Sequence, residues 1–216
     1  MGEDVFASHS KQYDDWYDSD SGRAIFTSEV ECLRPLIESA PRPWVEVGVG
    51  SGRFAASMKI ETGVDPSRPM LRIAQSRGIK TIQAMGEELP FKNGVFGTIL
   101  VAFTLCFVQD PAKFLIDLKR ALAQGGNMIL GLILSESPWG QYYKRLANEG
   151  HPIYGAAHFH SKLQVDTLLS QAGLAATRTR STLFQRPGLP SYSVEPSTEG
   201  YSPYAGFVGI AATKIK

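Results

Sequence analysis

The chain has few cysteines, almost no net charge and no long hydrophobic run, and each of these shortages excludes a class of protein. The two cysteines among 216 residues, Cys32 and Cys106, cannot build a disulfide framework, so we expect a reducing, cytoplasmic location. Lys and Arg number 22 against 21 Asp and Glu, which is not the basic excess typical of nucleic-acid binding. The longest apolar run, residues 98–108, is too short to span a membrane.

What the chain does have is a regular alternation of apolar and amphipathic segments, which predicts an α/β fold with a parallel sheet covered by helices. The expected strands are 44–47, 59–64, 80–83, 98–102, 128–134, 175–184 and 207–214. The expected helices are 69–77, 110–123 and 161–173, and the Pro-, Gly- and Ser-rich stretch 185–205 is expected to be a loop. The length suits a single domain over residues 1–216.

Two segments stand outside this alternation. Residues 5–38 precede the first expected strand, and residues 135–160 separate the fifth strand from the next helix. Open α/β sheets bind ligands at the carboxyl ends of their strands. We therefore expect both segments to be lids over a site at that edge.

The stretch WVEVGVGSGRF, residues 44–54, predicts a buried strand, a tight glycine turn and the start of a helix. Gly48, Gly50 and Gly52 lack Cβ atoms, so backbone N–H groups there can approach a ligand closely. The next expected strand ends on Asp65, whose carboxylate can accept hydrogen bonds from both hydroxyls of a ribose. This pair of features predicts a site for a nucleoside-containing cofactor.

Spacing favours one of two nucleoside cofactors. A dinucleotide fingerprint requires G-x-G-x-x-G with the pyrophosphate on a helix N-terminus, but here Arg53 holds the sixth position. Glu46, two residues before the first glycine, suits a cofactor that carries an ammonium and a sulfonium. The pattern E-x-G-x-G-x-G followed by a strand-end Asp resembles the class I S-adenosylmethionine (SAM) methyltransferases.

The resemblance extends over most of the chain, to the small bacterial methyltransferases of type 11. The matching pieces are VEVGVGSGRF, GVDPS, GEELPF, TILVAF, DPAKFLIDLKRAL, AQGGNMILG, FHSKLQVDTLLSQAGL and FVGIAATK. The resemblance implies a Rossmann-like, mostly parallel sheet of seven strands, with helices on both faces and the last strand antiparallel. It also implies an enzyme that transfers the methyl group of SAM and leaves S-adenosylhomocysteine (SAH).

The same resemblance implies which residues hold the cofactor. Glu46 and the three glycines would lie at the methionine end, and Asp65, with Pro66 beside it, would hold the ribose. The rest of the implied set is Met85, Gly86 and Glu87 near the adenine and Ala102 at the end of the fourth expected strand. Met85 stands where the family usually has an acid that reaches the adenine amine. Cys106 stands where a His or Glu often contacts the substrate.

Candidate substrate contacts lie in the two lid segments. Tyr13, Trp16 and Tyr17 form a stripe at helical spacing, which either packs on the core or contacts substrate, as in the N-terminal lid of this family. His158 is the fourth candidate, with a general-base role as its alternative. No carboxylate or Cys stands at a matching spacing to the histidines 151, 158 and 160, so no metal is expected.

The resulting hypothesis is a SAM-dependent methyltransferase with a small-molecule substrate. SAM is already activated, so no catalytic residue has to leave a motif, and a base is needed only if the attacking atom must lose a proton. One alternative is a SAM-binding sensor or assembly protein without turnover. The other is a nicotinamide-dependent oxidoreductase, against which Arg53 and the early third glycine argue. The oligomeric state is not encoded in any motif.

Overall fold

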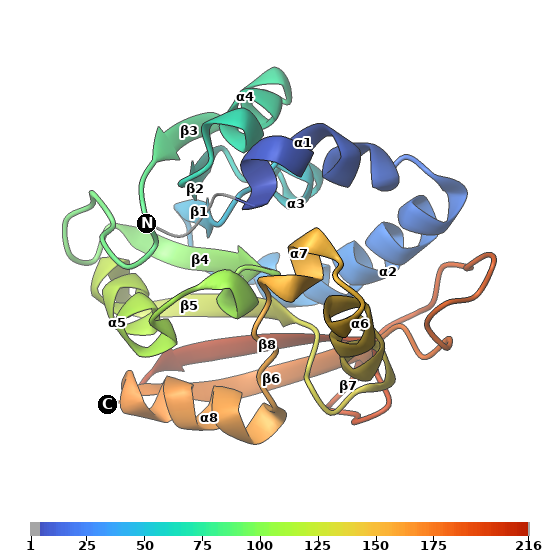
Figure 1. Ribbon diagram of the computed structural model, residues 1–216. Coiled ribbons are helices and arrows are strands. Elements are labelled where there is room, and N and C mark those ends of the chain that lie inside the picture. The colour runs from blue at the N-terminus through green and yellow to red at the C-terminus, as the bar shows by residue number, and fades with distance from the viewer. Residues whose placement is uncertain (1–4, 216) are drawn as a thin grey trace.

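The computed structural model describes residues 5–215 and contains one mixed sheet with helices on both faces (Figure 1). Eight strands of the described chain lie in the order β3-β2-β1-β4-β5-β8-β6-β7. Their bounds are β1 Trp44–Val47, β2 Thr62–Asp65, β3 Lys80–Gln83, β4 Phe96–Ala102, β5 Leu122–Leu132, β6 Leu174–Thr182, β7 Thr198–Glu199 and β8 Phe207–Lys214.

The pairing of the strands confirms a mostly parallel sheet. β1 pairs in parallel with β2 and β4, and further parallel pairs join β2 to β3 and β4 to β5. The last strand, β8, is antiparallel to both β5 and β6. The predicted count of seven is short by one, because β7 lies inside the stretch expected to be a loop. There Thr198 and Glu199 add two antiparallel pairs to the edge of β6.

The boundaries of β2, β4, β5 and β6 differ from the prediction, and β6 covers Leu174–Thr182 instead of 175–184. Lys59 ends a helix in the left-handed region, with φ at 57°, so β2 begins only at Thr62. β4 begins two residues early at Phe96, which pairs with Leu122 at the start of β5. β5 therefore covers residues expected to end the preceding helix, and it stops at Leu132 instead of 134.

The two faces of the sheet carry different helices, because strand residues alternate between two hydrophobic clusters. Ile99 and Val101 of β4 pack in one cluster with α5 (Pro111–Ala121) and α8 (Lys162–Gln171). Leu100 and Ala102 face the other cluster, which includes α2 (Asp20–Ile37), α3 (Arg53–Met58) and α4 (Arg68–Ser76). This arrangement leaves the carboxyl ends of β1, β4 and β5 open toward one edge.

The predicted lid segments form α1 (Val5–Trp16) and α2 on one side, and α6 (Pro138–Asn148) and α7 (Pro152–Gly155) on the other. Figure 1 shows α6 and α7 at the side of the sheet toward which β4 points. The second half of α2 packs on the sheet itself: Cβ atoms built at Gly131 and Gly209 would lie 3.2 and 3.1 Å from Leu33. Only the first turns of α2 therefore lie near the site.

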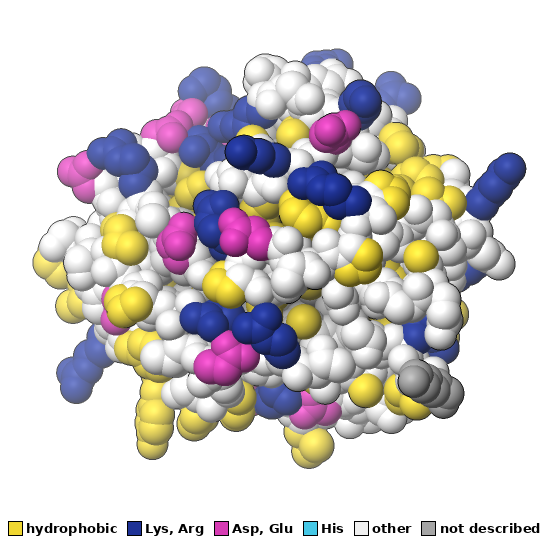
Figure 2. All heavy atoms as spheres, turned by 180° about the vertical axis from the view of Figure 1, so that it is seen from behind, with side chains coloured by type: hydrophobic (Ala, Val, Ile, Leu, Met, Phe, Trp, Pro, Cys, Tyr) yellow, Lys and Arg dark blue, Asp and Glu magenta, His cyan; other side chains and the backbone are white. Residues whose placement is uncertain are grey.

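The exposed surface mixes both signs of charge. On the face opposite to the view of Figure 1, Lys and Arg side chains are interspersed with Asp and Glu (Figure 2). Among the described residues, no helix combines the length and hydropathy required to cross a membrane.

Candidate active site

The turn after β1 adopts a backbone that glycine is required to make. Gly48, Gly50 and Gly52 all have positive φ, at 75°, 50° and 81°. A Cβ on Gly48 would lie 2.0 Å from Oγ1 of Thr104, and one on Gly52 would lie 3.0 Å from Cβ of Ala74. A Cβ on Gly50 would meet no heavy atom within 4 Å. Two of the glycines therefore serve packing, whereas Gly50 presents open backbone to a ligand.

Asp65, the last residue of β2, is hydrogen-bonded to this turn. Its Oδ2 accepts a bond of 2.9 Å from the Gly50 N–H, and its Oδ1 accepts one of 2.8 Å from the Ser67 N–H. Each carboxylate oxygen has two lone pairs and can accept more than one hydrogen bond. The structure thus brings the two features of the sequence prediction, the glycine turn and the strand-end acid, into direct contact.

Glu46 supplies a second carboxylate beside the turn, on β1. The side chain is 1% exposed, and its Oε2 has no hydrogen-bond partner in the structure. Burial raises the pKa of Glu46 well above its usual range, while a hydrogen bond with the Ala55 backbone acts in the opposite direction. A buried acid with one unpaired oxygen, on the strand that leads into the glycine turn, fits a cofactor with positive charge, as SAM has at its ammonium and sulfonium.

The implied adenine residues lie beyond the neighbouring strand. β3 runs parallel to β2, and the Ala84 N–H donates to the Asp65 carbonyl at 3.3 Å, so Met85 follows close to Asp65. Met85 is 51% exposed. Gly86 has a packing reason to be glycine, because a Cβ there would lie 2.2 Å from Cε2 of Phe114. The other members of the set are Pro66 (exposed), Glu87 (half-buried) and Ala102 (buried).

A cavity of about 740 Å³, here called the aromatic cavity, lies beyond the carboxyl ends of β4 and β5. Its walls include Phe103 after β4, Ile133 after β5, residues of α1, α2, α6 and α7, and the 188–192 loop. Its aromatic lining residues are Tyr13, Trp16, Tyr17, Phe103, Phe107, Trp139, Tyr142, Tyr143, Tyr154, Phe159 and Tyr192. Both lid segments therefore line one cavity, which has the size and mainly apolar lining of a small-molecule site.

Three of the four predicted substrate residues line this cavity. Tyr13 and Tyr17 share a hydrogen bond of 3.1 Å between their hydroxyls, and Trp16 packs edge-on against Tyr17. His158 is exposed and is not a lining residue, and its backbone N–H donates to the Cys106 carbonyl at 2.6 Å. His151, which caps α7, lines the cavity instead.

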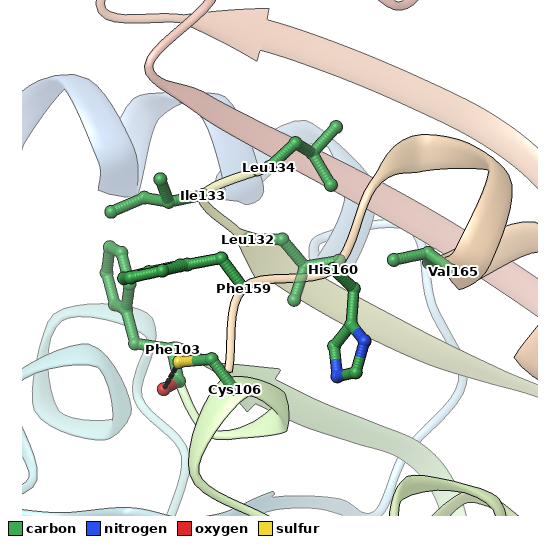
Figure 3. Close-up of a pocket in the computed structure, with 8 residues that line it drawn as sticks. All are labelled: Phe103, Cys106, Leu132, Ile133, Leu134, Phe159, His160 and Val165. Carbon is green, nitrogen blue, oxygen red and sulfur yellow. Dashed lines mark hydrogen bonds between the residues drawn. The ribbon is translucent and has the colours of Figure 1, made fainter. Parts of the chain in front are cut away.

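Cys106 and His160 belong to a much smaller apolar pocket of about 10 Å³ behind Phe159 (Figure 3). The Cys106 thiol donates to the Phe103 carbonyl at 3.2 Å, and burial raises its pKa to about 12. Burial also lowers the pKa of His160, whose Nε2 has no partner in the structure. The Cys106 thiol is therefore protonated at neutral pH, and it also lines the aromatic cavity. Within the described chain, no three His, Cys, Asp or Glu side chains gather as a metal site would require.

An ionic cluster, here called the lid clamp, ties α1 to the glycine turn. Nε of Arg53, directly after Gly52, lies 2.7 Å from Asp14, and its Nη2 lies 2.9 Å from Asp18. Arg77 bridges Asp14 at 2.7 Å and donates to the Ser51 carbonyl at 2.7 Å. Desolvation opposes ionisation of Asp14, but hydrogen bonds from Arg53 and Arg77 outweigh it and lower the pKa. Arg53, which breaks the dinucleotide pattern, thus connects the predicted N-terminal lid segment to the glycine turn by ion pairs.

Glu29 is a site residue that the sequence prediction missed. It lies on α2 with Ser21 and Ile25, facing the aromatic cavity, and is 3% exposed. Its Oε2 has no hydrogen-bond partner, and burial raises its pKa well above the usual value. An acid in the apolar stripe of a helix, between Ile25 and Leu33 at spacings of four, was the available signal.

Replacing Glu29 by Gln should change how stability depends on pH. In the folded chain Glu29 keeps its proton above its usual pKa near 4.5, whereas the unfolded chain loses it, so wild-type stability falls as pH rises through that window. Above pH ~4.5 we expect the free energy of unfolding of the variant to rise relative to that of the wild type, by at most about 1.4 kcal/mol per pH unit. Denaturant melts between pH 5 and 8 measure this.

The other titratable groups of the cavity should not account for this difference in stability between pH 5 and 8. The facing hydroxyls belong to Tyr13, Tyr17, Tyr143 and Tyr154, whose pKa values burial raises further above neutral. The cavity also contains the imidazoles of His9 and His151. Both proteins have these imidazoles, so their contribution cancels in the stability difference. A stability difference that is constant over this pH range would contradict the burial of an unpaired acid.

Comparison with known proteins agrees with this geometry. Residues 45–130 match the family model described as "Methyltransferase domain". The structure superposes with a TM-score of 0.89 on a SAM-dependent methyltransferase from Thermotoga maritima, described as a "possible histamine N-methyltransferase". That protein is 34% identical, and the match covers 97% of this chain and 98% of the other.

Sequence relatives extend the comparison. An uncharacterised protein of Mycobacterium tuberculosis is 44% identical over 93% of this chain and 70% of its own length. A demethylmenaquinone methyltransferase of Thermus thermophilus is 31% identical over 44% of this chain and 48% of its own length. A glycine turn bonded to a strand-end acid, the buried Glu46 with its unpaired Oε2, and a relative that matches over nearly its whole length point the same way. The chain belongs to the SAM-dependent methyltransferases of the class I fold.

Proposed function

We propose that the chain transfers the methyl group of SAM to a small molecule that occupies the aromatic cavity. The observation that carries the proposal is that the cavity begins where the cofactor turn ends. Phe103 lines the cavity, and the next residue, Thr104, has its Oγ1 3.3 Å from the Gly48 carbonyl oxygen. An acceptor in the cavity would therefore lie beside the methionine end of the cofactor.

The residues divide the work between holding the cofactor and enclosing the acceptor. SAM, when bound, supplies a methyl group already activated by the sulfonium. Asp65 would hold the ribose, Glu46 and the glycine turn the methionine end, and Met85, Gly86 and Glu87 the adenine. The aromatic walls and the lid clamp orient the acceptor and exclude water, which is the main contribution that such a transfer needs from the protein.

Relatives point to different acceptors. The Thermotoga maritima protein is described as a possible histamine N-methyltransferase, and the Thermus thermophilus protein is described as a demethylmenaquinone methyltransferase. The class of acceptor therefore has to be argued from the cavity of this chain.

Titration calorimetry with SAH tests the cofactor, and transfer from labelled SAM tests the enzyme. We expect one SAH site per chain, and SAH at 100 times its dissociation constant should raise the free energy of unfolding by about 2.7 kcal/mol. Absence of heat and of a thermal shift at millimolar SAH would overturn the proposal. SAH binding without transfer to any amine, phenol or thiol of a broad panel would favour the sensor alternative instead.

A further inference from the structure

The aromatic cavity contains a single carboxylate among the lining residues that the structure describes, and that carboxylate is Glu29. None of these lining residues is Lys or Arg. The remaining titratable groups are tyrosine hydroxyls, the thiol of Cys106 and the imidazoles of His9 and His151. A ligand in this space therefore meets one site of potential negative charge surrounded by aromatic rings.

Glu29 has no counterpart within the protein. Its carboxylate makes no ion pair with a described residue, and its Oε2 is buried without a hydrogen-bond partner. The buried carboxylate of Asp14, by contrast, is paired with two arginines, Arg53 and Arg77. A buried acid without a partner costs free energy, and such groups are kept where a ligand completes them.

Four of the tyrosine rings that line the cavity with Glu29 form two pairs. Tyr13 and Tyr17 meet edge to face at 5.5 Å between ring centroids, on the α1 side. Tyr143 of α6 and Tyr154 of α7 lie with centroids 4.2 Å apart on the other side. All four tyrosines line the same cavity as Glu29. Aromatic faces attract organic cations, and a carboxylate adds a charge-assisted hydrogen bond to an ammonium.

We propose that the acceptor is a small organic amine that binds as its cation, with the ammonium on the Glu29 carboxylate and its apolar part against the aromatic walls. Before transfer the ammonium gives one proton to Glu29. The freed nitrogen lone pair then forms a bond to the methyl carbon of SAM as the bond from that carbon to sulfur breaks, which leaves SAH and the N-methylated ammonium. This inference rests on the proposed function and names the chemical class of its substrate. An ammonium would supply the missing partner of Glu29, whereas a carboxylate or a phosphate would place a second negative charge beside it. A neutral alcohol would make a hydrogen bond with the protonated acid but would gain no charge-assisted contact.

Three ligands of equal skeleton test the inference: phenethylamine, 2-phenylethanol and 3-phenylpropionate. Binding to the full chain saturated with SAH is followed by the fluorescence of Trp16 and Trp139, which both line the cavity. We expect the amine to bind at least about tenfold more tightly than the alcohol, as a charge-assisted contact predicts, and the carboxylate to bind more weakly than both.

Variants separate the charge of Glu29 from its volume. Glu29→Gln should lower the affinity for phenethylamine by about 10- to 100-fold and leave that for 2-phenylethanol within about threefold. Glu31→Gln is the matched control, because Glu31 lies on the same helix with its side chain 52% exposed. A thermal melt and SAH calorimetry of each variant show that the fold and the cofactor site persist.

Each outcome bears on one claim only. If the wild type binds amine and alcohol equally, or if Glu29→Gln keeps the preference for the amine, the inference about the acceptor is wrong while SAH binding still stands. If the wild type fails to bind SAH, the proposed function is wrong. Preference for the amine that is lost in Glu29→Gln and kept in Glu31→Gln supports the inference.

Discussion

Removing residues 1–18 should abolish detectable methyl transfer while leaving a folded sheet. The deletion takes away Tyr13, Trp16 and Tyr17 from the cavity wall and Asp14 from the lid clamp, so water enters the space that encloses the acceptor. Ser19 is kept because its side chain caps α2 by accepting from the Gly22 N–H at 3.0 Å. Activity with labelled SAM and a circular dichroism melt measure the two effects.

A pair of neighbouring point variants separates the clamp from general damage to α1. Asp14→Ala leaves Arg53 and Arg77 without their shared partner and should cost roughly 1.5–3 kcal/mol of stability, as for a buried charge-assisted contact. It should also weaken SAH binding, because Arg53 directly follows the glycine turn. Asp15→Ala removes only an exposed pair with Lys11 and should change stability by less than about 0.5 kcal/mol. A deletion variant that turns over at the wild-type rate would show that the lid is dispensable.

Asp65→Ala should lower the affinity for SAH by about 10- to 100-fold, the range expected from the loss of charge-assisted hydrogen bonds. The substitution removes the proposed acceptor of two ribose hydroxyls. It also frees the Gly50 and Ser67 N–H groups that Asp65 now holds. Calorimetry with SAH measures the affinity, and a melt without ligand measures how much of the loss comes from the turn itself.

Asp65→Asn serves as the companion of this variant. The amide keeps the shape and one acceptor oxygen but removes the charge, so its SAH affinity should fall between those of the wild type and Asp65→Ala. Unchanged binding by Asp65→Ala would mean that the ribose does not lie at the end of β2, and the placement of the cofactor would have to be abandoned.

The cofactor half of the site was predictable because its signals are local. The glycine turn directly follows a strand in the sequence. Its positive φ values favour glycine, so Gly48, Gly50 and Gly52 indicate the turn without any knowledge of the tertiary structure. Asp65 was predictable because parallel strands place their carboxyl ends at one edge, which brings the end of β2 to the end of β1. Neither inference needs a contact between segments of unknown packing.

Element boundaries and the eighth strand were less predictable for a physical reason. Apolar periodicity does not reveal that Lys59 turns left-handed at the end of α3 and delays β2. The two residues of β7 carry no apolar pattern, and they form a strand only because Arg180 and Ser181 of β6 offer an unpaired edge. The delayed start of β2 and the formation of β7 depend on packing against other segments, which the local sequence does not specify.

By itself the sequence determined the alternation of strands and helices, the glycine turn and the acid at the end of β2, because each depends on residues close together in the chain. Only the tertiary structure decided the acceptor half. Glu29 joins Tyr143 and Tyr154 because α2, α6 and α7 converge beyond β4 and β5, and Arg53 becomes a clamp because α1 folds back over the glycine turn. Long-range packing selects which polar groups share a cavity, and burial then sets the chemistry available to them.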